Sequence, residues 1–106
     1  MAMAARASGV PETMRAVEVA PGDPSPASMS VVEAPLPVLG DGELLIHVAA
    51  TAVNRADTLQ RKGRYPVPPG ATQIMGLECS GTVVAGLEAE VGTEVMALLP
   101  GGGYAE

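Results

Sequence analysis

The segment from Asn54 to Gly70 holds the side chains of this 106-residue chain that are best suited to binding a polar ligand. Asn54 offers an amide, Asp57 follows with a carboxylate, and Tyr65 carries a phenol on a short segment rich in proline. Proline restricts the backbone, so the tyrosine is held on a stiff loop. Loop residues that a rigid scaffold holds in place often bind ligands. We therefore interpret this segment as one wall of a binding cleft.

The same residues also have a structural explanation. Asn54 is a favoured N-cap residue, Asp57 stands where a near capping box needs an acceptor, and Gly63 suits the left-handed position after a helix. With the basic residues that follow, these signals predict a short helix over residues 55–62. Asn54 and Asp57 can therefore serve the helix start, and Tyr65 can pack against its own loop. Structural and functional roles stay open for all three residues.

Short β-rich segments make up most of the remaining chain. Proline and glycine separate them, and they span residues 14–19, 29–33, 43–53, 79–85 and 94–99. The run 43–53 fits either a buried strand or a buried helix, and its flanking glycine together with the helix signal after it favours a strand. His47 in this run is expected to face solvent or a neighbouring strand. The pattern predicts a mainly β domain, a small and partly open barrel with one short helix.

Composition argues against several classes of function. A net charge of -6 disfavours a nucleic-acid partner. The single cysteine, Cys79, excludes an internal disulfide and a zinc site built from several thiolates, which predicts a reducing, cytoplasmic location. No apolar run approaches the ~20 residues that span a bilayer, so we expect no membrane partner. The core must be aliphatic, because the only aromatic residues are two tyrosines.

The order of several motifs resembles a known family. The motifs are Met-Arg-Ala at 14–16, Val53-Asn-Arg-Ala-Asp57, Gly63-Arg-Tyr-Pro66, Met75-Gly-Leu-Glu-Cys-Ser-Gly81 and Val95-Met-Ala-Leu-Leu-Pro-Gly-Gly-Gly-Tyr-Ala-Glu106. Together they resemble the N-terminal, GroES-like half of the quinone oxidoreductases, which are zinc-free members of the medium-chain dehydrogenase/reductase superfamily. The likeness is greatest to the p53-inducible quinone oxidoreductase subgroup. It implies an incomplete GroES-like domain over residues 14–106, after a disordered tail of residues 1–13.

The resemblance implies NADPH-dependent reduction of quinones or similar conjugated carbonyls. In that chemistry the cofactor supplies hydride, while the protein orients the acceptor and stabilises charge on its oxygen. Asn54 would lie beside the nicotinamide and the substrate, and Asp57 beside the substrate. Tyr65 would be the catalytic donor of a hydrogen bond to the substrate oxygen. The resemblance also implies that no zinc takes part, because Asn54 and Leu77 replace a Cys and a His that bind the metal in zinc-dependent relatives.

Parts of the family pattern are missing from the sequence. The chain contains no strand, glycine-rich loop and helix that could hold a nucleotide, and no helix signal follows the glycine triplet 101–103. We expect this chain alone to have no NADPH-dependent turnover, and to expose apolar surface that causes low stability or self-association. The segment 85–94 is shorter than its counterpart in similar enzymes and is expected to tighten or misregister a hairpin. Two other functions stay open: a non-enzymatic GroES-like binding or regulatory module, and a piece of an enoyl or alkenal reductase.

Overall fold

A computed structural model describes residues 5–6 and 9–106 of the chain. Its elements are β1 (Ala5–Arg6), β2 (Thr13–Val19), the short 3-10 helix η1 (Pro26–Ser28), β3 (Met29–Pro35), β4 (Leu45–Thr51), α1 (Arg55–Arg61), β5 (Glu78–Gly86), a second 3-10 helix η2 (Glu88–Glu90) and β6 (Glu94–Leu98). The described residues therefore form a mainly β fold with one α-helix, as the sequence predicts. Of the expected N-terminal tail, residues 1–4 and 7–8 lie outside the described part, and the domain boundary at residue 14 stays a prediction.

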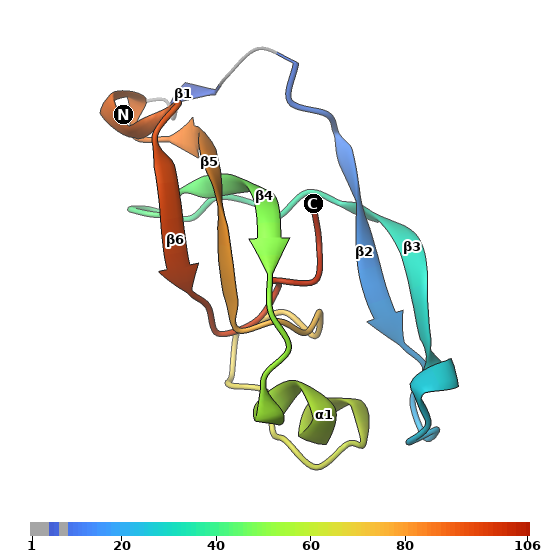
Figure 1. Cartoon of the computed structure of the whole chain (residues 1–106). Coiled ribbons are helices and arrows are strands. Elements are labelled where there is room, and N and C mark those ends of the chain that lie inside the picture. Colours follow the sequence, from blue (N-terminus) through green and yellow to red (C-terminus); the bar gives the residue numbers. More distant parts are fainter. Residues whose placement is uncertain (1–4, 7–8) are drawn as a thin grey trace.

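The strands form two antiparallel sheets, which do not close into a barrel (Figure 1). β5 is the centre of the larger sheet, where it pairs with β4, with β6 and with the short β1. β2 and β3 form a separate two-stranded ribbon, in which Met14 lies opposite Ala34 and Val19 opposite Met29. The predicted fold class, a mainly β and partly open barrel with one short helix, is thus confirmed in its strands, its single helix and its lack of closure.

Alternation along β5 creates the core. Its odd-numbered residues face inward, while the residues between them are only half-buried, which is the period-two pattern of a strand with one covered face. The buried apolar side chains of the described residues are Met14, Ala16, Met75, Cys79, Val83 and Ala85. None of them is aromatic, so the core is aliphatic, as composition predicts.

β4 confirms the strand that was predicted within the run 43–53, yet much of it is not buried. Residues 49–51 are exposed, and so is His47, as expected. Two large apolar side chains on β6, Met96 and Leu98, are 87% and 89% exposed. The described residues therefore do carry the exposed apolar surface that the sequence led us to expect.

The hairpin between β5 and β6 keeps a regular register. Its pairs run from Glu78 opposite Leu98 to Thr82 opposite Glu94. η2 lies in the connection between the two strands. The sequence led us to expect that the short connection would either tighten the hairpin or shift its register. The register is not shifted.

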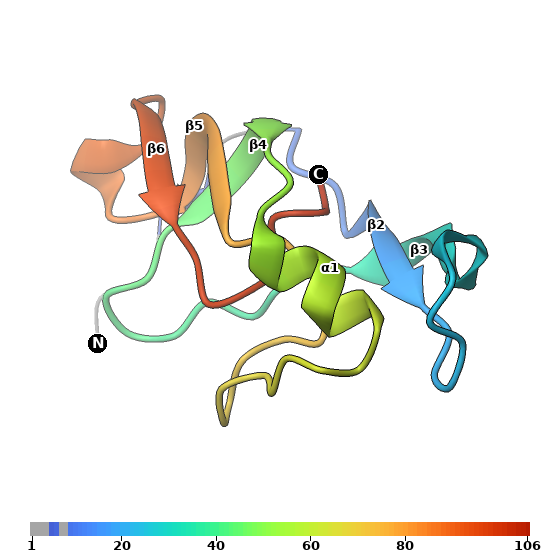
Figure 2. The same cartoon turned by 60° about the horizontal axis from the view of Figure 1, so that its bottom comes forward.

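Local sequence rules set both ends of α1. Asn54 occupies the N-cap position, and the helix ends one residue before its predicted end. Gly63 has φ +73, and its N–H donates to the carbonyl of Gln60 at 2.9 Å, while the N–H of Arg64 donates to the carbonyl of Leu59 at 2.8 Å. These two bonds form a Schellman motif. Figure 2 brings α1 to the front, below the strands of the larger sheet. No helix of the described part is long and apolar enough to cross a membrane.

The C-terminal residues join the two sheets, and the end of the chain lies between β4 and the β2–β3 ribbon (Figure 1). The carbonyl of Tyr104 accepts the N–H of Val17 at 2.9 Å. Glu106 donates its N–H to the carbonyl of Arg15 at 3.0 Å and accepts the N–H of Val48 at 2.7 Å. Its carboxylate also accepts a hydrogen bond from Nε of Arg15 at 2.8 Å. This segment therefore fixes the ribbon relative to the larger sheet.

Candidate functional site

The start of α1 holds two of the three predicted site residues together. The N–H of Asn54 donates to Oδ2 of Asp57 at 2.8 Å, which satisfies a backbone donor that the helix itself leaves unpaired. Asp57 is only 2% exposed, so its carboxylate lies inside the protein. The predicted structural role of Asp57 at the helix start is therefore confirmed, and any role in ligand binding stays a prediction.

Tyr104 approaches the same carboxylate from the far end of the sequence. Its hydroxyl donates to Oδ2 of Asp57 at 2.9 Å. Two glycines allow this approach: Gly76 has φ +105, and a Cβ added to it would lie 2.6 Å from Cα of Gly103. The backbone around Gly76 and the backbone around Gly103 cross there and are joined by hydrogen bonds. One of these runs from the N–H of Tyr104 to the carbonyl of Met75 at 2.9 Å. Close packing of two glycines thus positions the phenol.

The environment of Tyr104 keeps its hydroxyl protonated. Burial, the hydrogen bond to Asp57 and the negative charge of Asp57 together raise the pKa of Tyr104 to about 12, with burial the largest cause. A phenol with so high a pKa remains a donor at neutral pH. Tyr104 is therefore suited to holding Asp57 in place and not to accepting a proton.

Glu78, the first residue of β5, completes the arrangement. Nδ2 of Asn54 donates to Oε2 of Glu78 at 3.1 Å. The backbone of Glu78 is fixed as well, because its carbonyl accepts the hydroxyl of Thr51 at 2.7 Å. Glu78, Asn54, Asp57 and Tyr104 thus form a continuous chain of hydrogen bonds, which we call the polar network.

Tyr65, the third predicted site residue, lies apart from this network in its contacts. It is half-buried on the loop after α1. Within the described residues, no hydrogen bond joins its hydroxyl to Asn54 or Asp57. Its predicted catalytic role therefore stays a prediction, and the tyrosine that contacts Asp57 is Tyr104.

Sequence reasoning missed Tyr104 and the role of Glu78 in the network. Tyr104 and Asp57 are far apart in the chain, so no local pattern links them. The signal that could have indicated the contact is a pair of glycines, Gly76 and Gly103, each inside a motif of the family resemblance. A glycine whose neighbour must approach closely marks a backbone crossing, but a single sequence does not say which two segments cross.

The described residues contain no group of three or more His, Cys, Asp and Glu side chains that could hold a metal ion. Cys79 is buried, and burial raises the pKa of its thiol. A protonated, buried thiol behaves as a small apolar side chain. This agrees with the expectation that Cys79 belongs to the core.

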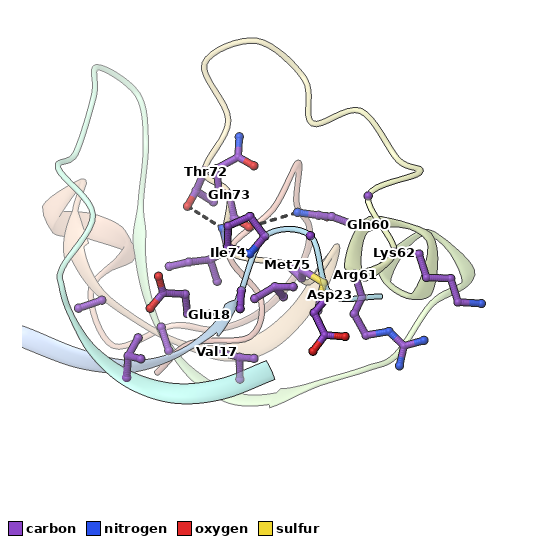
Figure 3. A pocket seen from close by; sticks show the side chains of 18 of the residues that line it. Val17, Glu18, Asp23, Gln60, Arg61, Lys62, Thr72, Gln73, Ile74 and Met75 are labelled. Carbon is purple, nitrogen blue, oxygen red and sulfur yellow. Dashed lines mark hydrogen bonds between the residues drawn. The ribbon is translucent and has the colours of Figure 1, made fainter. Parts of the chain in front are cut away.

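A cavity of about 910 Å³ lies between the β2–β3 ribbon, the end of α1 and the segment 72–75 (Figure 3). The side chain of Gln60 reaches across one side and donates to the carbonyl of Gln73 at 3.2 Å. The walls of the cavity carry charges of both signs, which include those of Arg61, Lys62, Glu18 and Asp23. No residue of the polar network lines this cavity, so the two features are separate.

Comparison with protein families classifies the chain. The model of the alcohol dehydrogenase GroES-like domain matches residues 40–105, which is more than half of the chain. The chain belongs to this family. The predicted relationship to the GroES-like half of the medium-chain dehydrogenases/reductases is thereby confirmed, and the whole polar network lies within the matched residues.

Similar proteins carry names that point to different activities. The human synaptic vesicle membrane protein VAT-1 homolog-like is 37% identical over 75 residues, which cover 67% of this chain and 18% of that protein. A zinc-type alcohol dehydrogenase-like protein of Schizosaccharomyces pombe is 34% identical over 74 residues, covering 68% and 22%. A trans-enoyl reductase of Cordyceps militaris is 42% identical over 77 residues, covering 72% and 20%.

The fold of the human relative is also similar. Its crystal structure superimposes with a TM-score of 0.75 at 34% identity, covering 89% of this chain and 31% of that chain. The described fold is therefore that of an N-terminal domain in this family. The chain itself spans 18% to 22% of the length of the three curated relatives.

Proposed function

We propose that the chain is the substrate-side domain of an NADPH-dependent reductase whose acceptor is a quinone or a similar conjugated carbonyl. The observation that carries the proposal is the amide of Asn54, which is half-buried at the start of α1 and held by Glu78 on one side. Membership of the GroES-like domain family supports NAD(P)-dependent oxidoreductase chemistry in general. The preference for NADPH and for quinones rests on the motif resemblance.

The donor set of the site fits a carbonyl ligand. Nδ2 of Asn54 carries two hydrogens, and within the described residues one of them is bound by Glu78 while the other has no partner. That second hydrogen can donate to an uncharged carbonyl oxygen of the cofactor or the acceptor. Bound NADPH supplies the hydride. Tyr65, on the neighbouring loop, would donate a hydrogen bond to the acceptor oxygen as charge develops on it.

We further propose that the reaction does not use zinc. Leu77 cannot bind a metal, and the amide of Asn54 is a poor substitute for a thiolate in a tetrahedral zinc site. The zinc-type relative of Schizosaccharomyces pombe makes this worth testing directly. In this chain extended by a nucleotide-binding domain, turnover that survives exhaustive treatment with a chelator supports the proposal, and turnover restored only by added zinc contradicts it.

Reduction of an enoyl group is the second candidate. It is favoured by the trans-enoyl reductase of Cordyceps militaris, which has 42% identity to this chain over the matched residues. Both reactions add a hydride to a conjugated system, so the same half-site can serve either. A side-by-side assay with a 1,4-naphthoquinone and a straight-chain 2-enoyl thioester separates them through the ratio of the two kcat/KM values.

The test of the proposal uses two proteins, this chain and the same chain extended by a nucleotide-binding domain of the medium-chain dehydrogenase type. We expect NADPH to bind measurably in calorimetry only to the extended protein, which then reduces the quinone. Binding and turnover by the short chain would contradict our expectation that it is inactive alone. An extended protein that binds NADPH but reduces neither acceptor would favour a non-enzymatic binding or regulatory module.

A further inference from the structure

The amide of Asn54 faces the carboxylate of Glu78, a residue whose backbone is anchored in the larger sheet. Glu78 is anchored by the larger sheet, where it lies opposite Leu98 and accepts the hydroxyl of Thr51 through its carbonyl. Its Oε2 lies 3.1 Å from Nδ2 of Asn54. The backbone that carries this carboxylate is therefore held by β4, β5 and β6 and not by the helix that begins at Asn54.

A carboxylate can only accept hydrogen bonds, whereas an amide has one end that donates and one that accepts. The two ends are nearly equal in size, so shape alone does not decide which way the amide of Asn54 is turned. Facing Glu78, only the nitrogen end can be accommodated. The carboxylate thus favours one of two orientations of the amide, the one in which its oxygen end is turned toward the N–H of Asp57 in the capping box.

The helix start does not need this contact. The backbone of Asn54 is already held by Asp57 at 2.8 Å, and Asp57 is in turn held by Tyr104. The hydrogen bond between Asn54 and Glu78 involves the side chain of Asn54 and not its backbone. The effect of Glu78 therefore falls on the orientation of the amide and not on the stability of α1.

We propose that Glu78 is a positioning residue, which turns the amide nitrogen of Asn54 toward β5 and leaves its second hydrogen to donate to an uncharged carbonyl oxygen of the cofactor or the acceptor. The nearby negative charge of Glu78 disfavours an anionic ligand at this point. The orientation of the amide is a property of this chain, while the identity of its ligand rests on the proposed function.

The first experiment follows the side-chain amide of Asn54 by NMR in the ¹⁵N-labelled 106-residue chain. Glu78→Gln is compared with Glu94→Gln, which makes the same charge change at an exposed position of β6. We expect E78Q to shift both Asn54 side-chain protons and E94Q to leave them unchanged, with urea midpoints of the two variants alike. Unchanged Asn54 resonances in E78Q would overturn the proposal. So would a large loss of stability in E78Q alone, because it would make Glu78 a structural residue.

The second experiment exchanges the two groups. In Asn54→Asp combined with Glu78→Gln, the hydrogen bond and the net charge are retained, but position 54 has no hydrogen left to donate. In the extended protein, with NADPH and a 1,4-naphthoquinone, we expect E78Q to raise KM about tenfold, the effect of one lost hydrogen bond to an uncharged ligand group. We expect the exchanged variant to be as stable as E78Q and not to recover the KM of the unmodified protein. Recovery of KM would overturn the assignment of Asn54 as the donor.

The two experiments fail separately. If the wild-type extended protein reduces no quinone, the proposed function fails, while the NMR comparison still decides whether Glu78 orients the amide. If quinone is reduced but the Asn54 resonances do not shift in E78Q, the positioning role fails and the proposed function stands.

Discussion

Replacing Tyr104 with phenylalanine tests whether the polar network stabilises this chain. The variant Tyr104→Phe keeps the aromatic ring and removes only the hydroxyl that donates to Oδ2 of Asp57 at 2.9 Å. Asp57 is 2% exposed, and its Oδ1 already has no partner within the described residues. After the substitution, the N–H of Asn54 is the one hydrogen bond left to this carboxylate in the described part.

The expected cost follows from these contacts. A hydrogen bond to a charged group contributes about 1.5–3 kcal/mol, and leaving a buried acceptor unpaired costs a similar amount. Because Tyr104 is itself half-buried, water can replace part of the lost contact, so we expect a loss of about 2 kcal/mol in the free energy of unfolding. The total free energy of unfolding of a domain is only about 5–15 kcal/mol, so a loss of this size should be readily measurable.

The assay is urea unfolding followed by circular dichroism at neutral pH, with Tyr65→Phe as the matched control. The hydroxyl of Tyr65 forms no hydrogen bond with the polar network, so its removal should cost less than about 0.5 kcal/mol. Equal effects of Y104F and Y65F would refute the reasoning, because they would mean that the contact with Asp57 contributes nothing. A changed slope with denaturant would indicate altered compactness and not a lost bond.

Three further outcomes can be measured on the same protein. The raised pKa of Tyr104 contributes stability that is fully present below about pH 10, the pKa of the unfolded chain, and is lost as the pH rises toward about 12. Absorbance titration of the two phenols should therefore show one late ionisation step, which the Y104F substitution removes. The hydrogen bond from Arg15 lowers the pKa of Glu106 and so stabilises the folded state at neutral pH. This stabilisation is lost as the pH falls through the lowered pKa. Glu106→Gln should therefore make the urea midpoint depend less on pH on the acid side. Gly76→Ala should cost about 3 kcal/mol or more in thermal unfolding, because its Cβ would meet Gly103, whereas Gly22→Ala, with φ +83 and open space, should cost about 1 kcal/mol.

Local patterns in the sequence were sufficient for α1 and for most strands. Asn54 and Gly63 specify the two helix ends through contacts with residues only a few positions away. Such short-range signals can be evaluated from the sequence alone. The strand within 43–53 also follows from its flanking signals, although its exposure does not, because burial depends on what covers the sheet.

The site was predicted only where its contacts are local. Asn54 and Asp57 share one helical turn, and their pairing follows from the capping pattern. The contact between Tyr104 and Asp57 depends on the crossing of Gly76 with Gly103, a tertiary feature that no local pattern specifies. The same limit explains why β1, which pairs Ala5–Arg6 with the end of β5, was not predicted.

Glu78 of the polar network and the exposed apolar side chains of β6 lie on the same side of the larger sheet. Glu78 lies directly opposite Leu98, and Ser80 lies opposite Met96, so these four side chains share one face of the strand pair. Met96 and Leu98 are almost fully exposed, so within the described part this face has no cover. A ligand at Asn54, which contacts Glu78, would therefore lie at the border of an uncovered apolar face. Covering that face would exclude water from the amide and strengthen its hydrogen bond to a carbonyl. Ligand binding at Asn54 and burial of Met96 and Leu98 should therefore favour each other, since each removes water that competes with the other.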